Sequence, residues 1–314
     1  MILSVSRRTD IPALYSEWFM NRLREGFVYV KNPFNANQIS KVAITKDVVD
    51  CIVFWTKDPQ PILKYLPDID EMGYNYYFQV TITPYDTRYE KNVREKKEIA
   101  DTFIELSDIL GKERVILRYD PIFLAGKYTL KYHIRAFQSI CDKLNPYTNK
   151  VIFSFVDGYK KTVHNTKDAP IQELTNSDML KIAEAFSEIT KPYGLLLETC
   201  AEKIQLTNYG ISPARCIDGD LIQSIIGYEI SNKSVRDDNR EACGCMKCID
   251  IGQYDTCTHG CTYCYANINK DKAQENYNNH NPLSPMLVGS YEHAIVKERK
   301  DVKSFRIEQL SLDI

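Results

Sequence analysis

Short apolar runs alternate with helical patterns along most of this chain, and this alternation constrains the fold more than any other feature. Each run has the length of a buried strand, and amphipathic or charged stretches separate the runs. Such a rhythm is typical of parallel βαβ units. Strands are expected at 2–5, 42–44, 51–55, 76–82, 115–117, 151–156 and 195–197, and the clearest helices at 89–110, 130–144 and 178–189.

Polar residues follow nearly every expected strand, in the segments SRRTD, WTKDP, TITPY, RYDP and ETCAE. In a (β/α) barrel the carboxyl ends of the strands form the active-site face, so this repetition favours a barrel over two domains. The simpler interpretation is that polar residues only mark loops. We predict an α/β fold with a complete or partial TIM-like barrel over 1–230. A Cys-rich metal-binding segment over 231–270 and an extension over 271–314, packed on the barrel, complete the expected organisation.

The chain has ten cysteines, and six of them lie between residues 243 and 264. A small secreted protein would use such crowding for disulfides. In a chain of 314 residues whose first residues lack the long apolar run of a secretion signal, crowded cysteines favour metal binding. The sequence therefore predicts a metal site in this segment.

Three of these cysteines, Cys257, Cys261 and Cys264, follow the spacing C-x3-C-x2-C, with the aromatic Tyr263 directly before the last. A [4Fe–4S] cube usually takes four thiolates, so three on one short loop leave one iron open for a small molecule. Gly260 relaxes the backbone inside the loop. The alternative is structural zinc, which closes its site with four ligands and could recruit His259.

This loop resembles the cluster-binding signature of the radical S-adenosylmethionine superfamily. The resemblance implies that Cys257, Cys261 and Cys264 hold a [4Fe–4S] cluster whose open iron chelates S-adenosylmethionine, and that Tyr263 packs near the adenine. It also implies reductive cleavage of this cofactor to a 5′-deoxyadenosyl radical. In that superfamily the motif follows the first barrel strand, whereas here it lies near the C-terminus, so the resemblance implies a permuted order.

Over nearly its full length the chain is similar to the family called domain of unknown function 1848. The similarity rests on four segments: SVSRRTDIPA at 4–13, VFWTKDP at 53–59, ILRYDPI at 116–122, and CGCMKCIDIGQYDTCTHGCTYCYAN at 243–267. It implies a superfamily and no substrate.

Four further cysteines, Cys200, Cys216, Cys243 and Cys245, could close a second [4Fe–4S] cluster with no open iron. Cys200 ends an expected strand and should lie on the active face, and Cys248 is a possible substitute ligand. The alternatives are a single zinc ion, or small buried cysteines without a metal. Cys-Gly-Cys is hard to explain as core, which favours a metal.

Charged and polar residues at strand ends should surround the cofactor. Arg7 and Arg118 can each bind a carboxylate through two hydrogen bonds, although an Arg118–Asp120 ion pair that shapes the rim is an alternative. His133 is expected on a surface helix and carries no catalytic pattern. The other candidate cofactor-binding residues are polar positions in or beside apolar strands: Gln79, Thr81 and Glu198.

The net charge of −2 gives no general reason to bind nucleic acid or a membrane, and no apolar stretch approaches the ~20 residues of a membrane span. We therefore expect a cytoplasmic radical enzyme with an unknown substrate and an electron donor such as flavodoxin or ferredoxin. The alternative is a non-enzymatic iron–sulfur electron carrier or a zinc-stapled binding protein. A barrel with polar strand ends argues against the alternative, because a carrier does not need such a face.

Overall fold

A computed structural model of the chain describes residues 1–32, 35–156, 165–167, 169–231, 233 and 243–307. At its centre, the described strands form an eight-stranded sheet in the order β10-β1-β4-β5-β6-β7-β8-β9, and every neighbouring pair is parallel. This sheet confirms the predicted α/β fold and is consistent with a partial TIM-like barrel. Its strands are β1 (Ile2–Val5), β4 (Cys51–Thr56), β5 (Tyr76–Thr81), β6 (Val115–Ile122), β7 (Lys150–Phe155), β8 (Leu196–Thr199), β9 (Ser212–Pro213) and β10 (Ile249–Asp250).

The Cys-rich segment links the two ends of this sheet. Strand β10 comes from this segment and pairs with β1. Just before β10, the Met246 N–H donates to the Ile217 carbonyl at 3.0 Å, beyond the end of β9. The Ile217 N–H in turn donates to the Cys245 sulfur at 3.4 Å. The segment from 243 onward is therefore part of the sheet architecture and not only a loop above it.

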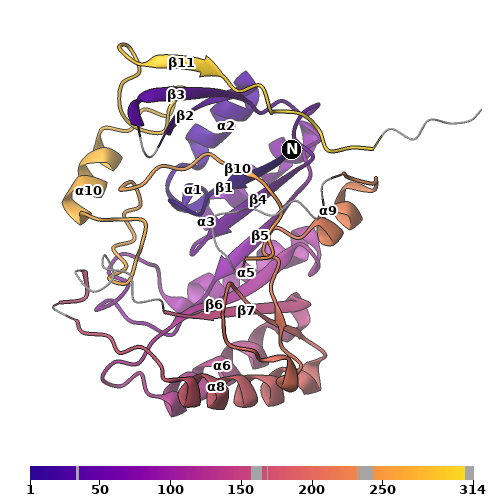
Figure 1. Cartoon of the computed structure of the whole chain (residues 1–314), viewed down its shortest axis with the longest axis vertical. Helices are drawn as coiled ribbons and strands as arrows, with labels where there is room; N and C mark the ends of the chain where they lie inside the picture. Colours follow the sequence, from indigo (N-terminus) through magenta and orange to yellow (C-terminus); the bar gives the residue numbers. More distant parts are fainter. Residues whose placement is uncertain (33–34, 157–164, 168, 232, 234–242, 308–314) are drawn as a thin grey trace, which may run out of the picture.

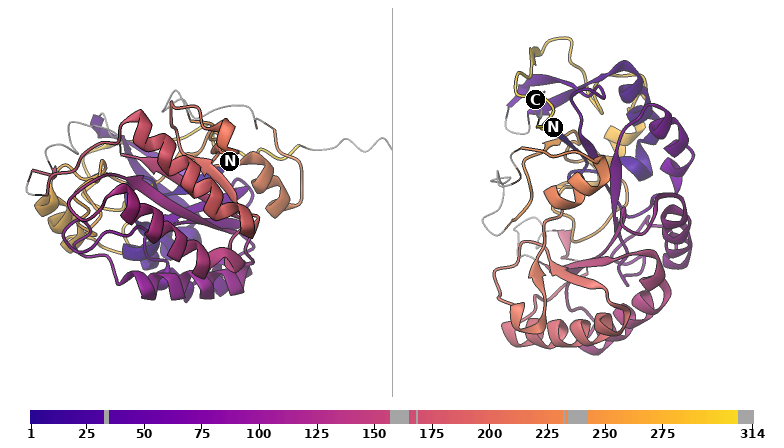
Figure 2. Two further views of the ribbon diagram at one scale, coloured as in Figure 1. Left: turned by 90° about the horizontal axis from the view of Figure 1, so that it is seen from below. Right: turned by 90° about the vertical axis from the view of Figure 1, so that its right-hand side faces the viewer.

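The helices up to residue 190 cover one side of the curved sheet, and the Cys-rich segment, coloured orange, lies on the other side (Figures 1 and 2). The helix Gly219–Ile226 also packs on the side of the Cys-rich segment. In the described parts of the chain, no helix combines the length and the apolar character needed to cross a bilayer. The helices are α1 (Ile11–Leu14), α2 (Ser16–Glu25), α3 (Gln60–Leu63), α4 (Leu66–Glu71), α5 (Lys96–Leu110), α6 (Leu130–Leu144), α8 (Asn176–Thr190), α9 (Gly219–Ile226) and α10 (Lys270–Asn278), with short 3-10 turns η1 (Asn145–Tyr147), η2 (Lys191–Tyr193) and η3 (Thr207–Tyr209).

The period of two along each strand sorts side chains between the two sides of the sheet. Phe78 of β5 belongs to the large core cluster shared with the helices. Tyr77 of β5 and Ile116 of β6 belong to a second cluster on the side of the Cys-rich segment. Two positions further along the same strands, Gln79 and Arg118 share the orientation of Tyr77 and Ile116. The alternation that builds the core therefore also turns these two polar side chains towards the cysteines.

A small second sheet lies beside the main one and accounts for an incorrect expectation. Residues 42–44 were expected as a strand of the βαβ series, but they fall at the end of β3 (Asn35–Ala43), which pairs antiparallel with β2 (Phe27–Asn32). The connection of two residues is too short for the crossover that parallel strands need, so the pair forms a hairpin. Strand β11 (Ile295–Glu298), from the C-terminal extension, pairs parallel with β3 and completes a three-stranded sheet (Figure 1).

The helix expected at 89–110 begins later than the charge pattern indicates. Helix α5 starts at Lys96, because residues before it form turns in which Glu90 is buried and bridges to the Cys-rich segment. The expected helix at 130–144 coincides with α6. The helix expected at 178–189 is α8, and its N-cap is Thr175, which forms a capping box with Asp178.

His133 is expected on a surface helix, but its side chain is fully buried. Its Nε2 lies 2.9 Å from the Phe123 carbonyl, which can only accept, and its Nδ1 lies 2.9 Å from the Tyr119 hydroxyl. The ring is therefore protonated on Nε2 and accepts the hydroxyl proton of Tyr119 at Nδ1. Burial lowers the pKa of His133 to about 4, so the folded protein holds a neutral imidazole.

The burial of neutral His133 is expected to lower the stability of the folded protein in mild acid. Its pKa is about 6.5 in the unfolded chain and about 4 in the folded one, so below 6.5 the unfolded chain binds more protons. Stability should fall by up to roughly 3 kcal/mol as the pH drops from 6.5 towards 4. Urea unfolding at about pH 7 and about pH 4.5 measures the loss. His133→Gln, which keeps a donor and an acceptor, should reduce it, and an equal loss in both proteins would contradict this role.

Candidate metal centre and its cavity

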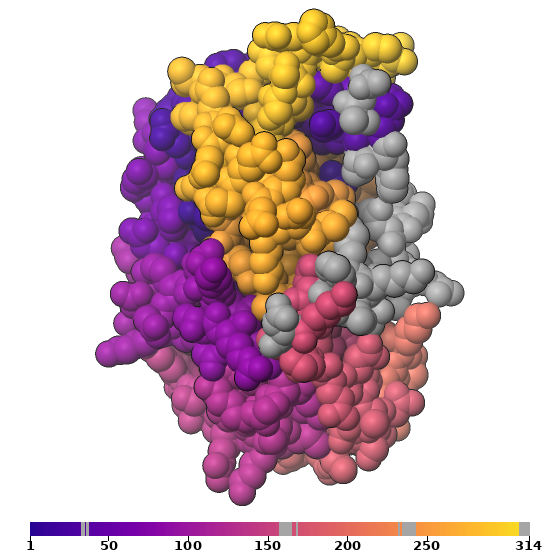
Figure 3. Space-filling model, turned by 90° about the vertical axis from the view of Figure 1, so that its left-hand side faces the viewer, coloured from indigo at the N-terminus to yellow at the C-terminus, as the bar shows by residue number. Residues whose placement is uncertain are grey.

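The polar tails of several strands meet at one cavity of about 810 Å³. Arg7 and Asp10 line it from the end of β1, Lys57 from the end of β4, and Arg118 from β6, together with cysteines of both predicted sets. Its volume falls within the range of roughly 300–1,000 Å³ that is typical of small-molecule sites. Figure 3 shows the orange residues of the Cys-rich segment and α10 lying across one face, between the purple N-terminal part and the red middle of the chain.

Cys257, Cys261 and Cys264 all line this cavity, and all are free thiols. Between the first two, Gly260 has a φ of +69°, the left-handed region that favours glycine. A Cβ at this position would also lie 3.2 Å from the Lys91 Cβ, so the loop passes close to a neighbouring segment. The loop therefore turns all three thiols towards the same space.

An acid–imidazole pair fixes the loop to the tails of β1 and β4. His259 Nε2 lies 2.7 Å from Asp10 Oδ2. The same carboxylate oxygen accepts the Lys57 N–H at 2.7 Å, and the other accepts the Ala13 N–H at 3.1 Å as the N-cap of α1. His259, the alternative zinc ligand, thus has its Nε2 engaged by Asp10.

The loop also forms backbone contacts with the turn after β5. Glu90 and Cys261 form an antiparallel bridge, and the Thr262 N–H donates to the Tyr89 carbonyl at 2.9 Å. On the other side of Gly260, the Asn92 N–H donates to the His259 carbonyl at 2.9 Å. The positions of these thiols are therefore set by main-chain pairing rather than by flexible side chains.

Glu90 is the centre of a buried ionic network beside Cys261, and no sequence motif indicates this role. Its side chain has no exposed area. Lys57 donates to it at 2.8 Å and the Thr83 hydroxyl at 2.6 Å, while Lys96 and the Tyr263 hydroxyl also donate to it. Burial alone would raise the pKa of Glu90, but the charges of Lys57 and Lys96 outweigh burial and lower it to about 2.

The three thiols fit a ligand that brings positive charge. Burial raises the pKa of Cys257 and Cys264, and it raises that of Cys261 to about 12 even though Lys57 opposes the shift. Thiolates bind metals, and a metal ion stabilises the thiolate form that burial disfavours. Among the described residues, no three Cys, His, Asp or Glu side chains are grouped as ligands of one metal ion. The thiolates of a cube bind separate irons and stand wider apart than ligands of one ion.

Tyr263, predicted to pack near adenine, lies at the cavity wall. Its ring packs 5.7 Å from that of Tyr85 and 5.4 Å from that of Phe123, and the Lys57 ammonium lies 5.7 Å from its centroid. Its hydroxyl donates to Glu90, so the ring is held from both ends. This places a fixed aromatic surface beside the thiols.

Arg118 and Gln79 contact the second set of cysteines. Arg118 binds both oxygens of Asp120, at 3.2 and 2.6 Å, which is the ion pair considered above, and its Nη1 lies 3.0 Å from the Cys216 sulfur. Gln79 Nε2 donates to the Cys216 carbonyl at 2.9 Å. The Thr81 hydroxyl donates to Asp120 at 3.4 Å. Arg118 and Gln79 therefore both contact Cys216, and Thr81 is linked to Arg118 through Asp120.

Arg7 lines the cavity, whereas Glu198 is not among the residues that line it. Arg7 lies 3.2 Å from the Cys248 sulfur and 3.8 Å from Asp250. Glu198 pairs with Lys150 at 3.0 Å, at the opposite end of β7 from the cavity. The strand register places Glu198 beside Ile152 and in line with Arg118, on the cysteine side of the sheet. Its carboxylate is engaged by Lys150 instead of facing the cavity.

Asp250 of β10 is a second residue that the sequence did not single out. It accepts from the Ser4 hydroxyl at 2.9 Å, the Ser6 hydroxyl at 2.6 Å, the Arg7 N–H at 2.8 Å and the Gly252 N–H at 3.0 Å. It therefore joins the Cys-rich segment to β1 and its tail. Only the pairing of β10 with β1 brings these residues together, so no local motif could indicate it.

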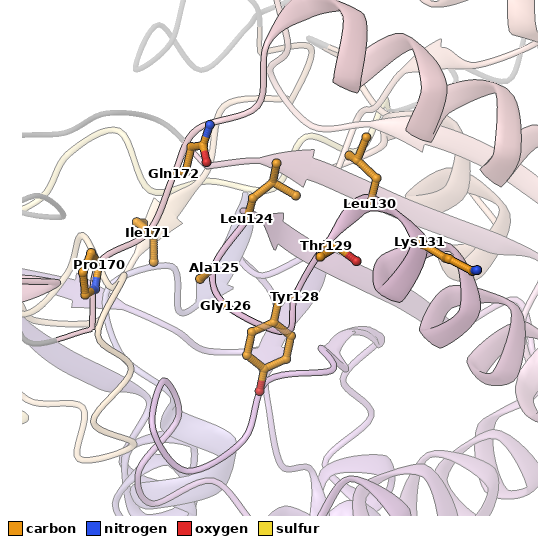
Figure 4. Close-up of a pocket in the computed structure, with 10 residues that line it drawn as sticks. All are labelled: Leu124, Ala125, Gly126, Tyr128, Thr129, Leu130, Lys131, Pro170, Ile171 and Gln172. Carbon is orange, nitrogen blue, oxygen red and sulfur yellow. The ribbon is translucent and has the colours of Figure 1, made fainter.

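A separate, smaller hollow of about 610 Å³ lies between residues 124–131 and 170–172 (Figure 4). Its lining includes Tyr128 and Lys131 but no cysteine, histidine or carboxylate. It therefore lacks the thiol, imidazole and carboxylate groups that bind metals, and the cysteine-lined cavity is the better candidate site.

A family model described as "Domain of unknown function (DUF1848)" matches residues 2–266. None of the curated proteins compared with the chain matches it. Among solved structures, a protein described as an alpha-L-fucosidase from Bacteroides thetaiotaomicron is 10% identical, with a TM-score of 0.20, over 57% of this chain and 72% of that chain. A similarity this low carries no argument about fold or function.

Proposed function

This chain belongs to the family described as domain of unknown function 1848, and we propose that it is a radical S-adenosylmethionine enzyme. The proposal is carried by the C-x3-C-x2-C loop, whose Cys257, Cys261 and Cys264 line one cavity at the carboxyl ends of parallel strands. Three thiolates leave one iron of a [4Fe–4S] cube without a protein ligand. When bound, the cluster would supply the electron that cleaves the sulfonium of S-adenosylmethionine and yields a 5′-deoxyadenosyl radical.

The late position of the loop in the chain is compatible with this function. In the superfamily the loop follows the first barrel strand. Here it follows β10, which lies beside β1 and runs parallel to it. The loop therefore extends from the same end of the sheet as the SRRTD tail of β1, although Asp10 and His259 are 249 residues apart in sequence.

Arg7 and Arg8 are the best candidates to bind the methionine carboxylate. Both line the cavity, next to the thiol loop, whose Tyr265 hydroxyl donates to the Arg7 carbonyl at 2.6 Å. Arg118 is the weaker candidate because both oxygens of Asp120 already bind its guanidinium. A guanidinium can bind a carboxylate through two hydrogen bonds, which would orient the cofactor as well as hold it.

Lys57 and Tyr263 would position the cofactor rather than react with it. Lys57 holds positive charge beside Cys261, which favours the thiolate that iron needs. The Tyr263 ring, fixed through Glu90, offers an apolar surface on which a purine can stack. The remaining volume of the cavity would admit a substrate, whose chemical class these residues do not define.

Anaerobic reconstitution with iron and sulfide tests the proposal. The protein should bind at least ~4 irons per chain, one cube, and should form 5′-deoxyadenosine when S-adenosylmethionine and a reductant are added. Reduced flavodoxin or ferredoxin should replace the chemical reductant. Bound iron without 5′-deoxyadenosine would favour an electron carrier. Zinc without iron would favour a zinc-stapled binding protein, and either result would contradict the proposed activity.

A further inference from the structure

Four cysteines outside the C-x3-C-x2-C loop gather at the cavity wall. Cys200 follows β8, Cys216 lies between β9 and α9, and Cys243 and Cys245 precede β10. All four are free thiols, and the cofactor chemistry proposed above uses none of them. Three separate parts of the chain thus bring thiols to one place.

The sulfurs of these four residues are in close contact. The Cys200 and Cys216 sulfurs lie 3.5 Å apart. Cys245 hydrogen-bonds with Cys216 and with Cys243, so the contacts form a row from Cys200 to Cys243. Around a tetrahedral zinc ion, thiolates stand roughly 3.8 Å apart, given Zn–S bonds of about 2.3 Å. The thiolates of a [4Fe–4S] cube bind separate irons and stand much farther apart, so these contacts fit one ion and not a cube.

Close backbone packing brings the two halves of this row together. A Cβ on Gly244 would lie 2.9 Å from the Arg215 Cγ and 3.4 Å from the Ala214 carbonyl. Glycine between the two cysteines therefore lets the Cys-Gly-Cys stretch lie against the chain just before Cys216. Tyr77 and Gln79 fix that chain by donating to the Cys216 carbonyl at 2.7 and 2.9 Å.

The surroundings of the sulfurs suit an ion bound by thiolates. Cys216, Cys243 and Cys245 are buried within the apolar cluster on the cysteine side of the sheet. Arg118 Nη1 lies 3.0 Å from the Cys216 sulfur, and the Ile217 N–H donates to the Cys245 sulfur at 3.4 Å. Zinc with four thiolates keeps an excess of negative charge, and donors of this kind offset that charge and hold the ligands in place.

The place of the row gives such an ion a structural role. Strands β9 and β10 are the two edge strands of the eight-stranded sheet, and Cys216 closely follows β9 whereas Cys245 closely precedes β10. Beside these cysteines, the Met246 N–H donates to the Ile217 carbonyl at 3.0 Å. An ion held by both cysteines would therefore join the two edges of the sheet.

We propose that Cys200, Cys216, Cys243 and Cys245 bind a single zinc ion that ties the two edges of the sheet together. In the described part of the chain the four thiols lie in a row, and no three of them surround one point. Binding therefore requires the end thiols, Cys200 and Cys243, to turn towards the middle. Each can do so about its one χ1 torsion, which has three staggered positions.

Metal analysis of a variant that lacks the first loop's thiols tests this site. Because the triple variant removes every ligand of that loop, any metal it retains is bound elsewhere: Cys257→Ala, Cys261→Ala and Cys264→Ala. Produced with zinc in the growth medium and then dialysed, the triple variant should retain ~1 zinc per chain.

Further substitutions in the triple variant identify the ligands. Adding Cys243→Ser and Cys245→Ser, which nearly keep the size of the side chains, should abolish zinc binding, because two thiolates do not complete a tetrahedral set. Adding Cys141→Ser instead is the matched control, since Cys141 lies in α6 and outside the cavity lining. This control should keep its zinc. Circular dichroism verifies that each variant is folded.

Two measurements on the triple variant alone do not depend on the folding of further variants. Cobalt(II) bound in place of zinc should show the visible absorption of a tetrahedral cobalt–thiolate centre. Removing zinc with a chelator should lower Tm by about 5–10 °C, because a structural zinc contributes directly to the stability of the fold.

Three results would overturn the zinc site. One is ~4 irons retained by the triple variant after anaerobic reconstitution, which would indicate a cube at these cysteines. The second is a folded triple variant that binds neither zinc nor cobalt, and the third is zinc that survives Cys243→Ser and Cys245→Ser. The site shares no ligand with the C-x3-C-x2-C loop. A wild type that makes no 5′-deoxyadenosine would therefore contradict the proposed radical function and leave the zinc site standing.

Discussion

Replacing Cys261 by alanine is expected to lower the yield of 5′-deoxyadenosine by more than about 100-fold, since losing a residue that merely orients a metal ligand already costs about 10–100-fold. Cys261 lies between the other two thiols in sequence and is paired through its backbone with Glu90, so no neighbouring thiol can take its place. Two thiolates cannot hold a cube that keeps only one iron open. Iron content and 5′-deoxyadenosine, measured after anaerobic reconstitution, should both fall.

Cys141→Ala is the matched control for this substitution. Both side chains are buried and both variants lose the same sulfur, but Cys141 lies in α6 within the core between helices and sheet. The control should keep its iron and its activity, apart from a small loss of stability from the cavity it creates. Equal loss of activity in both variants would show that folding, not ligation, is affected. Unchanged cleavage in Cys261→Ala would remove the ligand assignment.

Glu90→Gln is expected to destabilise the fold by about 3–5 kcal/mol, as breaking a buried ion pair does. The glutamine keeps the size of the side chain but leaves the ammonium groups of Lys57 and Lys96 without their counter-charge. The free energy of unfolding in urea at neutral pH measures the loss. Because the Glu90 backbone pairs with Cys261, the variant should also bind iron more weakly than wild type.

The difference in unfolding free energy between wild type and Glu90→Gln should become smaller as the pH falls. The pKa of Glu90 is about 2 in the folded protein against 4.5 in the unfolded chain. Its contribution to stability is therefore complete above about 4.5 and is lost as the pH falls towards 2. The difference between wild type and Glu90→Gln should narrow between about pH 5 and about pH 3. A constant difference would contradict the ion-pair account, and Glu105→Gln, exposed on α5, should differ little from wild type at any pH.

Two local patterns in the sequence determined the positions of the parallel strands and of the candidate metal loop. The period of apolar residues located β1, β4, β5, β6, β7 and β8 of the parallel sheet and the bounds of α6, because burial on a strand or a helix repeats at short range. The spacing of Cys257, Cys261 and Cys264 located the candidate metal loop, because all its proposed ligands lie within eight residues. Polar strand tails also indicated where the cavity would lie.

The contacts that complete the site were decided only by the tertiary structure. Glu90 and Asp250 join segments that are far apart in the chain. The buried ring of His133 hydrogen-bonds with Tyr119 and Phe123, which lie outside its own helix. Glu198 lies on the same side of the sheet as Arg118, but its ion pair with Lys150 keeps it out of the cavity lining. Strand β3 pairs with its hairpin neighbour rather than the main sheet. Sequence patterns report which side of an element is buried, whereas the partner it is buried against depends on how the whole chain packs.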